Sequence, residues 1–359
     1  MENRMNNKVD LKNYNLKEME VYLESIGEKK FRAKQIYQWI YRGACNFQEM
    51  TDLSKGLREK LEQSAMVGCL EMLQVQHSNT DGTKKYLFGL ADGNKIESVF
   101  MQYKFGNSIC LSSQAGCRMG CGFCASGIGG LKRNLTAGEM IDQILSVQRD
   151  TNEKINHIVI MGTGEPFDNY ENLSKFIHIV NSKEGLNIGM RNITVSTCGI
   201  LPKIATFAAD FPQVNLAISL HASNDDIRNQ TMPVNKTYPI GKLLEACRDY
   251  SKKTGRRVTF EYALVSGVND QTKNAEELAK LLKGLLCHVN LIPLNSVEET
   301  GLKGSSRKVA QLFKERLEQL GIPTTIRREL GSDINAACGQ LRLKNSQDSV
   351  VEIDNDSLD

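Results

Sequence analysis

The sequence has no long apolar run and very little net charge. No segment contains 18 consecutive apolar residues, and the stretch Met1 to Asn15 is polar and of mixed charge. We therefore expect neither a membrane-spanning helix nor an export signal. The 45 lysines and arginines are nearly balanced by 42 aspartates and glutamates, which leaves a net charge of +3. That charge alone does not indicate a nucleic-acid-binding protein, although the acidic residues at the C-terminal end leave the body more basic.

The ten cysteines do not form the pattern of a secreted disulfide scaffold. Three of them are clustered, the others are scattered, and no second Cys-x2-Cys occurs. A reducing cytoplasm is the expected compartment. The hydrophobic fraction of 40% and charged fraction of 24% in 359 residues are typical of a soluble protein with a barrel-sized domain and a smaller one.

The clustered thiols are Cys117, Cys121 and Cys124, in a Cys-x3-Cys-x2-Cys run. Thiolates are soft ligands that suit iron–sulfur clusters or zinc. A structural zinc ion normally takes four protein ligands, so the zinc alternative requires a distant Cys or His. A [4Fe–4S] cluster held by three cysteines would leave one iron open for a small molecule. We favour the cluster.

Hydrophobic periodicity divides the chain into four parts. Residues 1–70 predict a small helical accessory domain, because Ala33, Ile36 and Ile40 follow a helical spacing. Residues 71–104 predict a β-hairpin extension with turns at Asp81-Gly82 and Asp92-Gly93. Residues 105–342 alternate strands with helices, which predicts an α/β fold, a partial (β/α)6 barrel. Residues 343–359 predict a flexible acidic tail.

Within the helical part, the stretch from Lys29 to Arg42 interleaves cations with aromatic residues. Such a surface can contact phosphates and bases of RNA. The same spacing also predicts that Tyr37 and Trp39, the single tryptophan, belong to the core. Both interpretations remain open from the sequence.

Polar residues follow several of the predicted parallel strands. Because the carboxyl ends of such strands meet at one face, we expect these residues to form a pocket. The loop with Gly162 and Gly164 lacks the third glycine of a dinucleotide fingerprint, since Phe167 stands in its place. The candidate pocket residues are Gly164, Glu165, Ser196, Ser219, Leu220, His221 and Asn295.

The remaining cysteines occur singly. The default prediction for a lone cysteine is a small buried hydrophobic residue, which we apply to Cys45, Cys69, Cys198, Cys247 and Cys287. Cys338 lies beside Gly339 among small residues after the last strand, which favours an accessible loop. Cys110 lies ahead of the clustered thiols, and Glu97 lies inside a predicted strand.

The cysteine run, with Phe123 before its third thiol, resembles the cluster loop of radical S-adenosylmethionine (SAM) enzymes. Further motifs resemble the RlmN/Cfr family of adenine methyltransferases. They are Glu97, Cys110, Lys132-Arg133-Asn134-Leu135, Gly162-Thr163-Gly164-Glu165-Pro166, Ser219-Leu220-His221, Met232-Pro233, Gly267-Val268-Asn269-Asp270 and Asn335 to Leu341 with Cys338. Pro166 and Pro293-Leu294-Asn295 favour the C2-specific branch, since Cfr-type sequences carry alanine after the Gly-Glu pair.

The resemblance implies one [4Fe–4S] cluster per chain on Cys117, Cys121 and Cys124, and two SAM molecules per turnover. Gly164, Glu165, Ser196, Ser219, Leu220, His221 and Asn295 would bind SAM. The implied substrates are adenine 2503 of 23S rRNA and adenine 37 of certain tRNAs. A one-electron reductant such as flavodoxin, a monomeric state and no membrane association are also implied.

In the implied reaction, a cysteine of the protein carries the methyl group to the RNA. A first SAM methylates Cys338, and a radical made from a second SAM takes hydrogen from that methyl group. The methylene radical then adds to carbon 2 of adenine, a position too electron-poor for polar methyl transfer. Glu97 would remove the C2 proton, and Cys110 would release the product by forming a disulfide with Cys338.

Three alternatives are kept. A Cfr-type enzyme would methylate carbon 8 of adenine in 23S rRNA instead of carbon 2. A radical SAM thiotransferase would need a second cluster, for which the other seven cysteines are too scattered. A zinc-stapled RNA-binding module would have no activity, and anaerobic purification distinguishes it as a colourless zinc protein.

Overall fold

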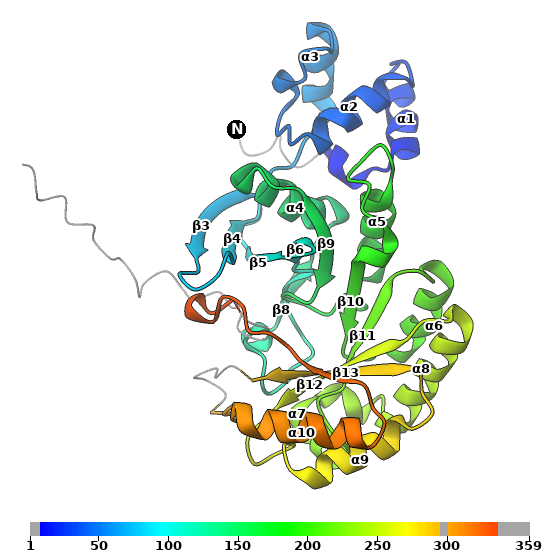
Figure 1. The fold of residues 1–359 in the computed structure, drawn as a ribbon. Helices are drawn as coiled ribbons and strands as arrows, with labels where there is room; N and C mark the ends of the chain where they lie inside the picture. Colours follow the sequence, from blue (N-terminus) through cyan, green and yellow to red (C-terminus); the bar gives the residue numbers. More distant parts are fainter. Residues whose placement is uncertain (1–7, 295–300, 337–359) are drawn as a thin grey trace, which may run out of the picture.

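The computed structural model describes residues 8–294 and 301–336. The chain begins with a small helical part and continues into a long mixed sheet (Figure 1). Cys338, Asn295 and the predicted tail 343–359 lie outside the described residues. No helix within the described residues is long and apolar enough to span a membrane.

The helical part contains three α-helices and a two-stranded parallel sheet. They are β1 (Val9–Asp10), α1 (Leu16–Ser25), α2 (Arg32–Tyr41), α3 (Lys55–Ser64) and β2 (Ala65–Met66). Asn15 and Glu18 form a capping box that starts α1. In α2, Tyr37 is fully buried and Trp39 is half-buried, while Lys34 is exposed.

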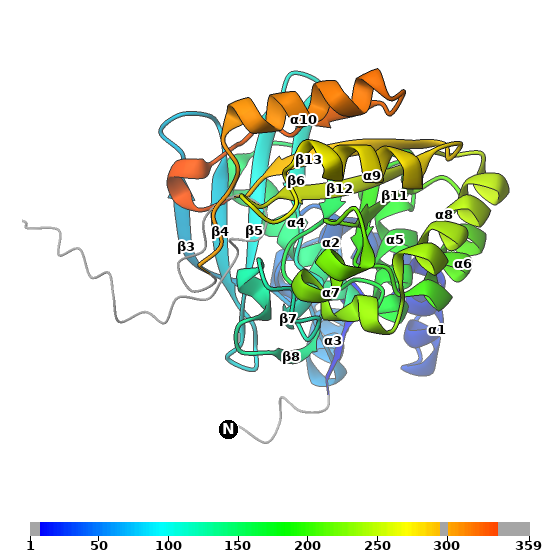
Figure 2. The ribbon, with the colours of Figure 1, turned by 90° about the horizontal axis from the view of Figure 1, so that it is seen from below.

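The parallel part of the main sheet confirms the predicted partial barrel. Its strands in chain order are β6 (Gly106–Cys110), β9 (Ile155–Ile160), β10 (Ile193–Thr197), β11 (Asn215–Ser219), β12 (Val258–Leu264), β13 (Cys287–Pro293) and β14 (Thr324–Ile326). The intervening helices are α4 (Ala137–Thr151), α5 (Tyr170–Asn181), α6 (Leu201–Asp210), α7 (Asp225–Thr231), α8 (Ile240–Thr254), α9 (Thr272–Leu282) and α10 (Arg307–Gln319). Figure 2 shows α6, α8 and α9 on the outer side of the bent sheet.

The predicted hairpin is continuous with the barrel sheet. Strands β3 (Glu71–His77), β4 (Lys84–Gly89) and β5 (Lys95–Tyr103) are antiparallel, and β5 pairs with the first barrel strand, β6. The 10-stranded sheet therefore runs without interruption from β14 to β3. A separate ribbon of β7 (Gln114–Gly116) and β8 (Leu131–Asn134) carries the cysteine run between its strands.

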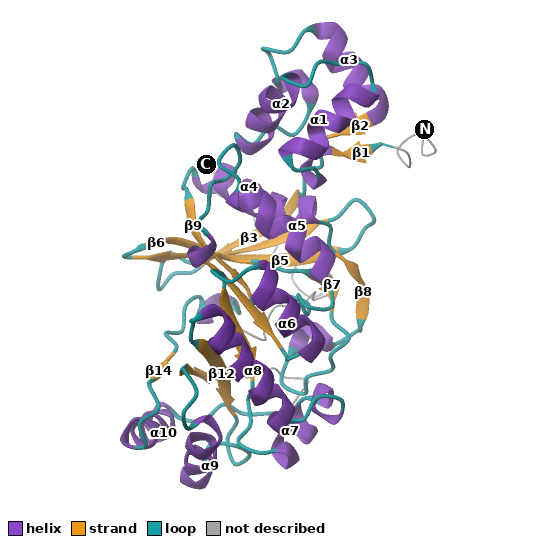
Figure 3. Cartoon of the chain, turned by 90° about the vertical axis from the view of Figure 1, so that its right-hand side faces the viewer, coloured by secondary structure: helices purple, strands orange, loops and turns teal. Residues whose placement is uncertain are grey.

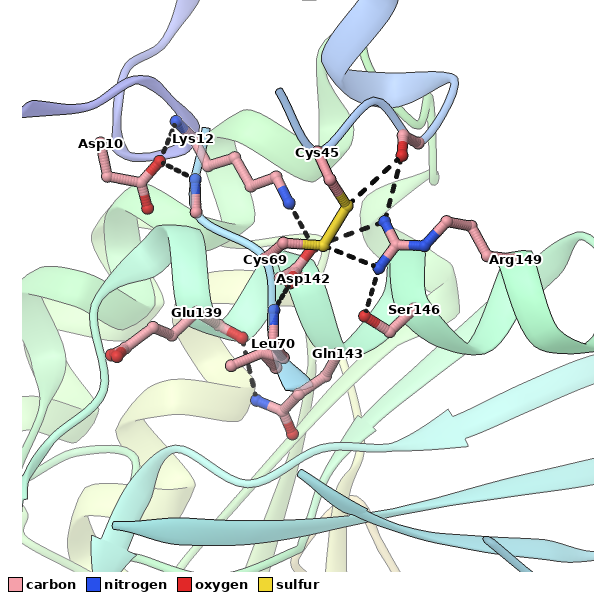
Figure 4. A network of polar contacts seen from close by, with 12 residues as sticks. Asp10, Lys12, Cys45, Cys69, Leu70, Glu139, Asp142, Gln143, Ser146 and Arg149 are labelled. Carbon is pink, nitrogen blue, oxygen red and sulfur yellow. Dashed lines mark hydrogen bonds and ion pairs between the residues drawn. A yellow bond between two sulfur atoms is a disulfide. The ribbon is translucent and has the colours of Figure 1, made fainter. Parts of the chain in front are cut away.

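The helical part joins the barrel through α4, at the end of the molecule opposite α9 and α10 (Figure 3). The Lys12 ammonium forms a buried ion pair with Asp142 of α4, and Asp142 also accepts a hydrogen bond from the Leu70 amide (Figure 4). Apolar side chains of both parts belong to one continuous core. The accessory domain is thus packed onto the barrel.

A disulfide joins Cys45 to Cys69 beside this ion pair (Figure 4). The expectation that these two cysteines are lone buried residues is wrong, since they are paired, Cys45 is half-buried and Cys69 is exposed. The guanidinium of Arg149 contacts Cys69 Sγ at 3.2 Å and the Gly43 carbonyl at 3.2 Å. The same prediction is confirmed for Cys198, Cys247 and Cys287, which are buried.

Candidate active site at the carboxyl ends of the parallel strands

The cysteine run forms a loop between β7 and a short 3₁₀ turn at Ala125–Gly127. Its backbone is anchored to α7, because the Gly122 amide donates a hydrogen bond to the Thr231 carbonyl at 2.8 Å. The side chains of Phe123, Cys198 and Met232 pack together beside Cys121 and Cys124. The loop is thereby held against the mouth of the barrel.

One cavity brings the three cysteines together with the ends of the parallel strands. Of the sequence-predicted residues, it is lined by Cys117, Cys121, Cys124, Gly164, Glu165, Ser196, Ser219 and His221. Leu220 is fully buried and does not line it, and Asn295 lies outside the described residues. Residues from several different strand ends therefore face one space, as the barrel topology requires.

The glycine loop after β9 approaches the rest of the site closely. Gly164 has a φ of 109°, and a Cβ there would lie 2.6 Å from the Cβ of Gln114. Only glycine fits this position without displacing its neighbour. Glu165 is fully buried, and its carboxylate accepts hydrogen bonds from the amides of Phe167 at 3.0 Å and Cys198 at 2.7 Å. Burial raises the pKa of Glu165.

His221 occupies a buried left-handed position with a φ of 55°. Its Nδ1 accepts a hydrogen bond from the Ala263 amide at 2.8 Å, so the proton of the neutral ring is on Nε2. Burial lowers the pKa of His221 to about 3, and the charge of Arg228 acts in the same direction. The imidazole is therefore a neutral hydrogen-bond donor at ordinary pH. Its ring packs edge-on against Phe123.

The thiols of the loop have the chemistry that an iron–sulfur cluster requires. Burial raises the pKa of Cys117 to about 11, and the nearby Cys124 acts in the same direction. Burial also raises the pKa of Cys121. Three neighbouring thiolates in this setting need bound cations to stabilise them, and iron ions would supply the charge.

The loop geometry also bears on the kind of metal centre. Over residues 8–294 and 301–336, no three His, Cys, Asp or Glu side chains are grouped so that they could hold a single metal ion. In a [4Fe–4S] cluster, each cysteine binds a different iron, so the sulfurs need only surround a shared space. The three cavity-lining thiols fit that requirement.

Neither Glu97 nor Cys110 is among the residues that line this cavity. Glu97, on β5, is buried and forms an ion pair with Lys85 at 2.8 Å. Cys110, at the end of β6, is buried in a small cluster with Leu330 and Ala336. Met161 packs against that cluster and also lines the cavity, so the two regions are contiguous.

The cavity is also lined by charged residues that no sequence motif indicates, Glu261 and Arg327. Glu261 of β12 is buried, and its carboxylate accepts a hydrogen bond from Asn290 at 2.9 Å. Burial raises the pKa of Glu261, while the charge of Arg327 acts in the opposite direction. The available signal was a carboxylate within the apolar run of a strand that had to be buried on both faces.

Both the helical part and the barrel of this chain are similar in sequence to known proteins. The sequence model "Ribosomal RNA large subunit methyltransferase N-terminal domain" matches residues 9–67, and the "Radical SAM superfamily" matches residues 111–282. The chain is 55% identical over 95% of its length to a probable dual-specificity RNA methyltransferase RlmN of Alkaliphilus oremlandii, covering 99% of that protein. It is 54% identical to a protein of the same name from Thermoanaerobacter sp., over 93% of this chain and 98% of that protein.

A solved structure has the same architecture. The crystal structure of a radical SAM methyltransferase from Sphaerobacter thermophilus superposes with a TM-score of 0.90 at 47% sequence identity. The match covers 93% of this chain and 99% of the other. The helical part and the barrel thus recur together in the same arrangement.

Proposed function

The chain belongs to the RlmN family of radical SAM methyltransferases, and on that premise we propose that it methylates carbon 2 of adenine in RNA through a methylated cysteine. The substrates proposed are adenine 2503 of 23S rRNA and adenine 37 of tRNA, in accessible contexts from which the base can be splayed out. A SAM-dependent radical mechanism is a property of the family. Three points are proposed: that the methylated nucleobase is adenine, that the methyl group is placed on carbon 2, and that the reaction passes through a methylated cysteine.

The observation that carries the proposal is the path of the chain before Cys338. Residues 331–336 leave the barrel and lie on the β3–β4 hairpin, where Asp333 accepts hydrogen bonds from Ser78 and Asn79 at 2.8 Å each. Ala336 packs in the cluster that contains Cys110. Two residues upstream of the proposed methyl carrier, the chain is thus next to the proposed resolving thiol.

Glu97 is linked to the same segment. The Lys85 ammonium lies 2.8 Å from Glu97 and donates a hydrogen bond to the Asn335 carbonyl at 3.2 Å. The cation stabilises the ionised carboxylate, which is the form that a general base needs. Glu97 and Cys110 therefore both border the segment that leads to Cys338.

These positions support three roles. The Cys338 sulfur would carry the methyl group, as its methylene radical, to carbon 2. The radical adduct would lose one electron, which the oxidised cluster would take back, and the Glu97 carboxylate would accept its C2 proton, which leaves a closed-shell thioether between carbon 2 and Cys338. The Cys110 thiolate would then attack the Cys338 sulfur, breaking its bond to the methylene carbon, which takes up a proton to become the product methyl group. The resulting disulfide would be reduced by cellular thiols.

The cofactors complete the proposal. One [4Fe–4S] cluster on Cys117, Cys121 and Cys124 with SAM in the cavity would supply the 5′-deoxyadenosyl radical. Gly164, Glu165, Ser196, Ser219, His221 and Asn295 would hold SAM, and Leu220, which does not line the cavity, would support Ser219 and His221 from behind. Two SAM molecules would be used per turnover, the electron would come from a reductant such as flavodoxin, and the enzyme would act as a monomer.

Nucleoside analysis tests the proposal directly. The protein is reconstituted with iron and sulfide without oxygen, then incubated with reductant, SAM and an RNA containing either target adenine. We expect 2-methyladenosine, with one S-adenosylhomocysteine and one 5′-deoxyadenosine formed per methyl group transferred. Formation of 8-methyladenosine instead would assign the chain to Cfr-type chemistry.

A further inference from the structure

Arg228 of α7 is the largest fully buried side chain among the described residues. Its guanidinium has five N–H groups, and five hydrogen bonds use them. The acceptors, in order of distance, are Cys198 O (2.7 Å), Asn235 Oδ1 (2.9 Å), Leu220 O (3.1 Å), Ser219 O (3.2 Å) and Tyr238 O (3.4 Å). Every one of these acceptors is neutral.

The charge of Arg228 has no direct carboxylate partner in the described part of the chain. None of the ion pairs there includes it. Asp225 is reached only through Asn235, whose amide donates to the Asp225 carboxylate at 2.8 Å. A buried charge without a counter-charge is costly, so a source of negative charge is expected close by.

The cysteine loop, with its three thiols, is the nearby source of negative charge. Gly122 of the loop is bonded to Thr231, three residues after Arg228, and Cys198, whose carbonyl binds the guanidinium, packs beside Cys121. Since Arg228 does not line the cavity and its donors are occupied, it acts on the loop by its charge alone.

We propose that Arg228 is the buried counter-charge of the iron–sulfur cluster and that it raises the reduction potential of the cluster. One-electron reduction makes the cluster more negative, so a fixed cation in a water-excluded setting stabilises the reduced form more than the oxidised form. Arg228 would thereby ease electron transfer from the cellular reductant without touching the cluster or SAM. This inference rests on the cluster proposed for this loop and does not depend on which RNA atom is methylated.

The test is a redox titration of the reconstituted protein, with the reduced cluster followed by electron paramagnetic resonance. Arg228→Lys keeps the charge, whereas Arg228→Gln and Arg228→Met remove it. At a fixed ambient potential, we expect the ratio of reduced to oxidised cluster to fall about tenfold in the two neutral variants, which is about 59 mV for a one-electron couple. Arg228→Lys should stay close to the wild type.

Arg118 provides a matched control, because it follows Cys117 directly but is exposed and paired with Asp168. Water screens such a charge, so Arg118→Gln should change the ratio by less than about twofold. A purely structural role of Arg228 predicts equal potentials in all Arg228 variants, and that result would overturn the proposal.

A charge-conserving swap covers the case in which the neutral Arg228 variants do not fold. Asp225→Asn with Asn235→Asp keeps the net charge and exchanges two side chains of similar size that already share a hydrogen bond. It moves the carboxylate next to the guanidinium and cancels its charge at the cluster. We expect the ratio of reduced to oxidised cluster to fall, and an unchanged ratio would contradict the proposal. Iron and sulfide content, measured first, separates a failure of this inference from the absence of a cluster.

Discussion

The barrel cavity and the surface of helix α2 hold their charges in opposite ways. Glu165, Glu261 and Arg228 are buried around the cysteine loop, and backbone groups or amides fix their geometry. On α2, Lys34 is exposed and Arg32 is half-buried. The ion pair between Lys30, which precedes α2, and Glu24 of α1 is open to solvent. Buried charges act strongly on a bound centre, whereas exposed charges act weakly and in a salt-dependent manner.

This contrast assigns different tasks to the two regions. The buried charges around the cavity can act strongly on a group bound there, because water screens them little. The α2 surface is suited at most to contacts with phosphates, in which each cation contributes a little and salt competes. Variants in each region should therefore differ in the size and the kind of their effects.

The largest effect is expected at the cysteine loop. Cys121→Ala should lose the cluster and all radical activity, because three thiolates leave no spare ligand. Iron and sulfide analysis measures the loss, and Cys247→Ala is the matched control, since Cys247 is a buried cysteine of α8. The control should keep its iron and lose about 1 kcal/mol of stability. A full complement of iron in Cys121→Ala would refute the ligand assignment.

The next largest effect is expected where the helical part joins the barrel, at the buried ion pair between Lys12 and Asp142. Asp142→Asn leaves the Lys12 ammonium buried without its carboxylate, which should lower the free energy of unfolding by about 3–5 kcal/mol. Urea denaturation measures it. Lys55→Met, which removes an exposed pair with Glu59, should cost less than about 1 kcal/mol. Equal effects of the two changes would show that burial does not strengthen the first pair.

The smallest effect is expected on the α2 surface. Replacing Lys30, Arg32 and Lys34 by Gln should weaken RNA binding and lower the slope of log affinity against log salt by roughly 0.7–0.9 for each phosphate that the protein no longer neutralises. SAM cleavage should be unaffected, because the cavity lies in the barrel. The same change at Lys252, Lys253 and Lys280, which are exposed on α8 and α9, is the control. If both triple variants behave alike, α2 has a structural role only.

Features whose residues lie close together in the sequence were predicted, whereas features whose residues meet only in the folded chain were missed. The cysteine loop has three thiols within eight residues, and the strand ends follow their apolar runs directly. The barrel was therefore predicted together with eight of the residues that line its cavity. The disulfide was missed because Cys45 and Cys69 are 24 residues apart and neither sits in a motif. Their meeting depends on how the helical part packs against α4.

Arg228 and Glu261, in and around the site, were missed for the same reason. The groups that bind the Arg228 guanidinium come from the ends of β10 and β11 and from the loop after α7, and no local pattern connects them. Glu261 lies in a strand, and its place in the strand does not by itself show that its side chain lines the cavity. Charged groups at a barrel mouth are therefore found by topology more readily than by sequence motif.

The most direct measurement of the central claim is a denaturing gel of Cys110→Ala incubated with SAM, reductant and labelled RNA. The variant should still methylate Cys338 and attack adenine, yet be unable to release the product. We predict a covalent protein–RNA band that resists denaturant, whereas Cys338→Ala should give none. Glu97→Gln should accumulate the same band, because an adduct that keeps its C2 proton cannot be fragmented. Turnover at the wild-type rate by Cys110→Ala, with no crosslinked band, would contradict the account.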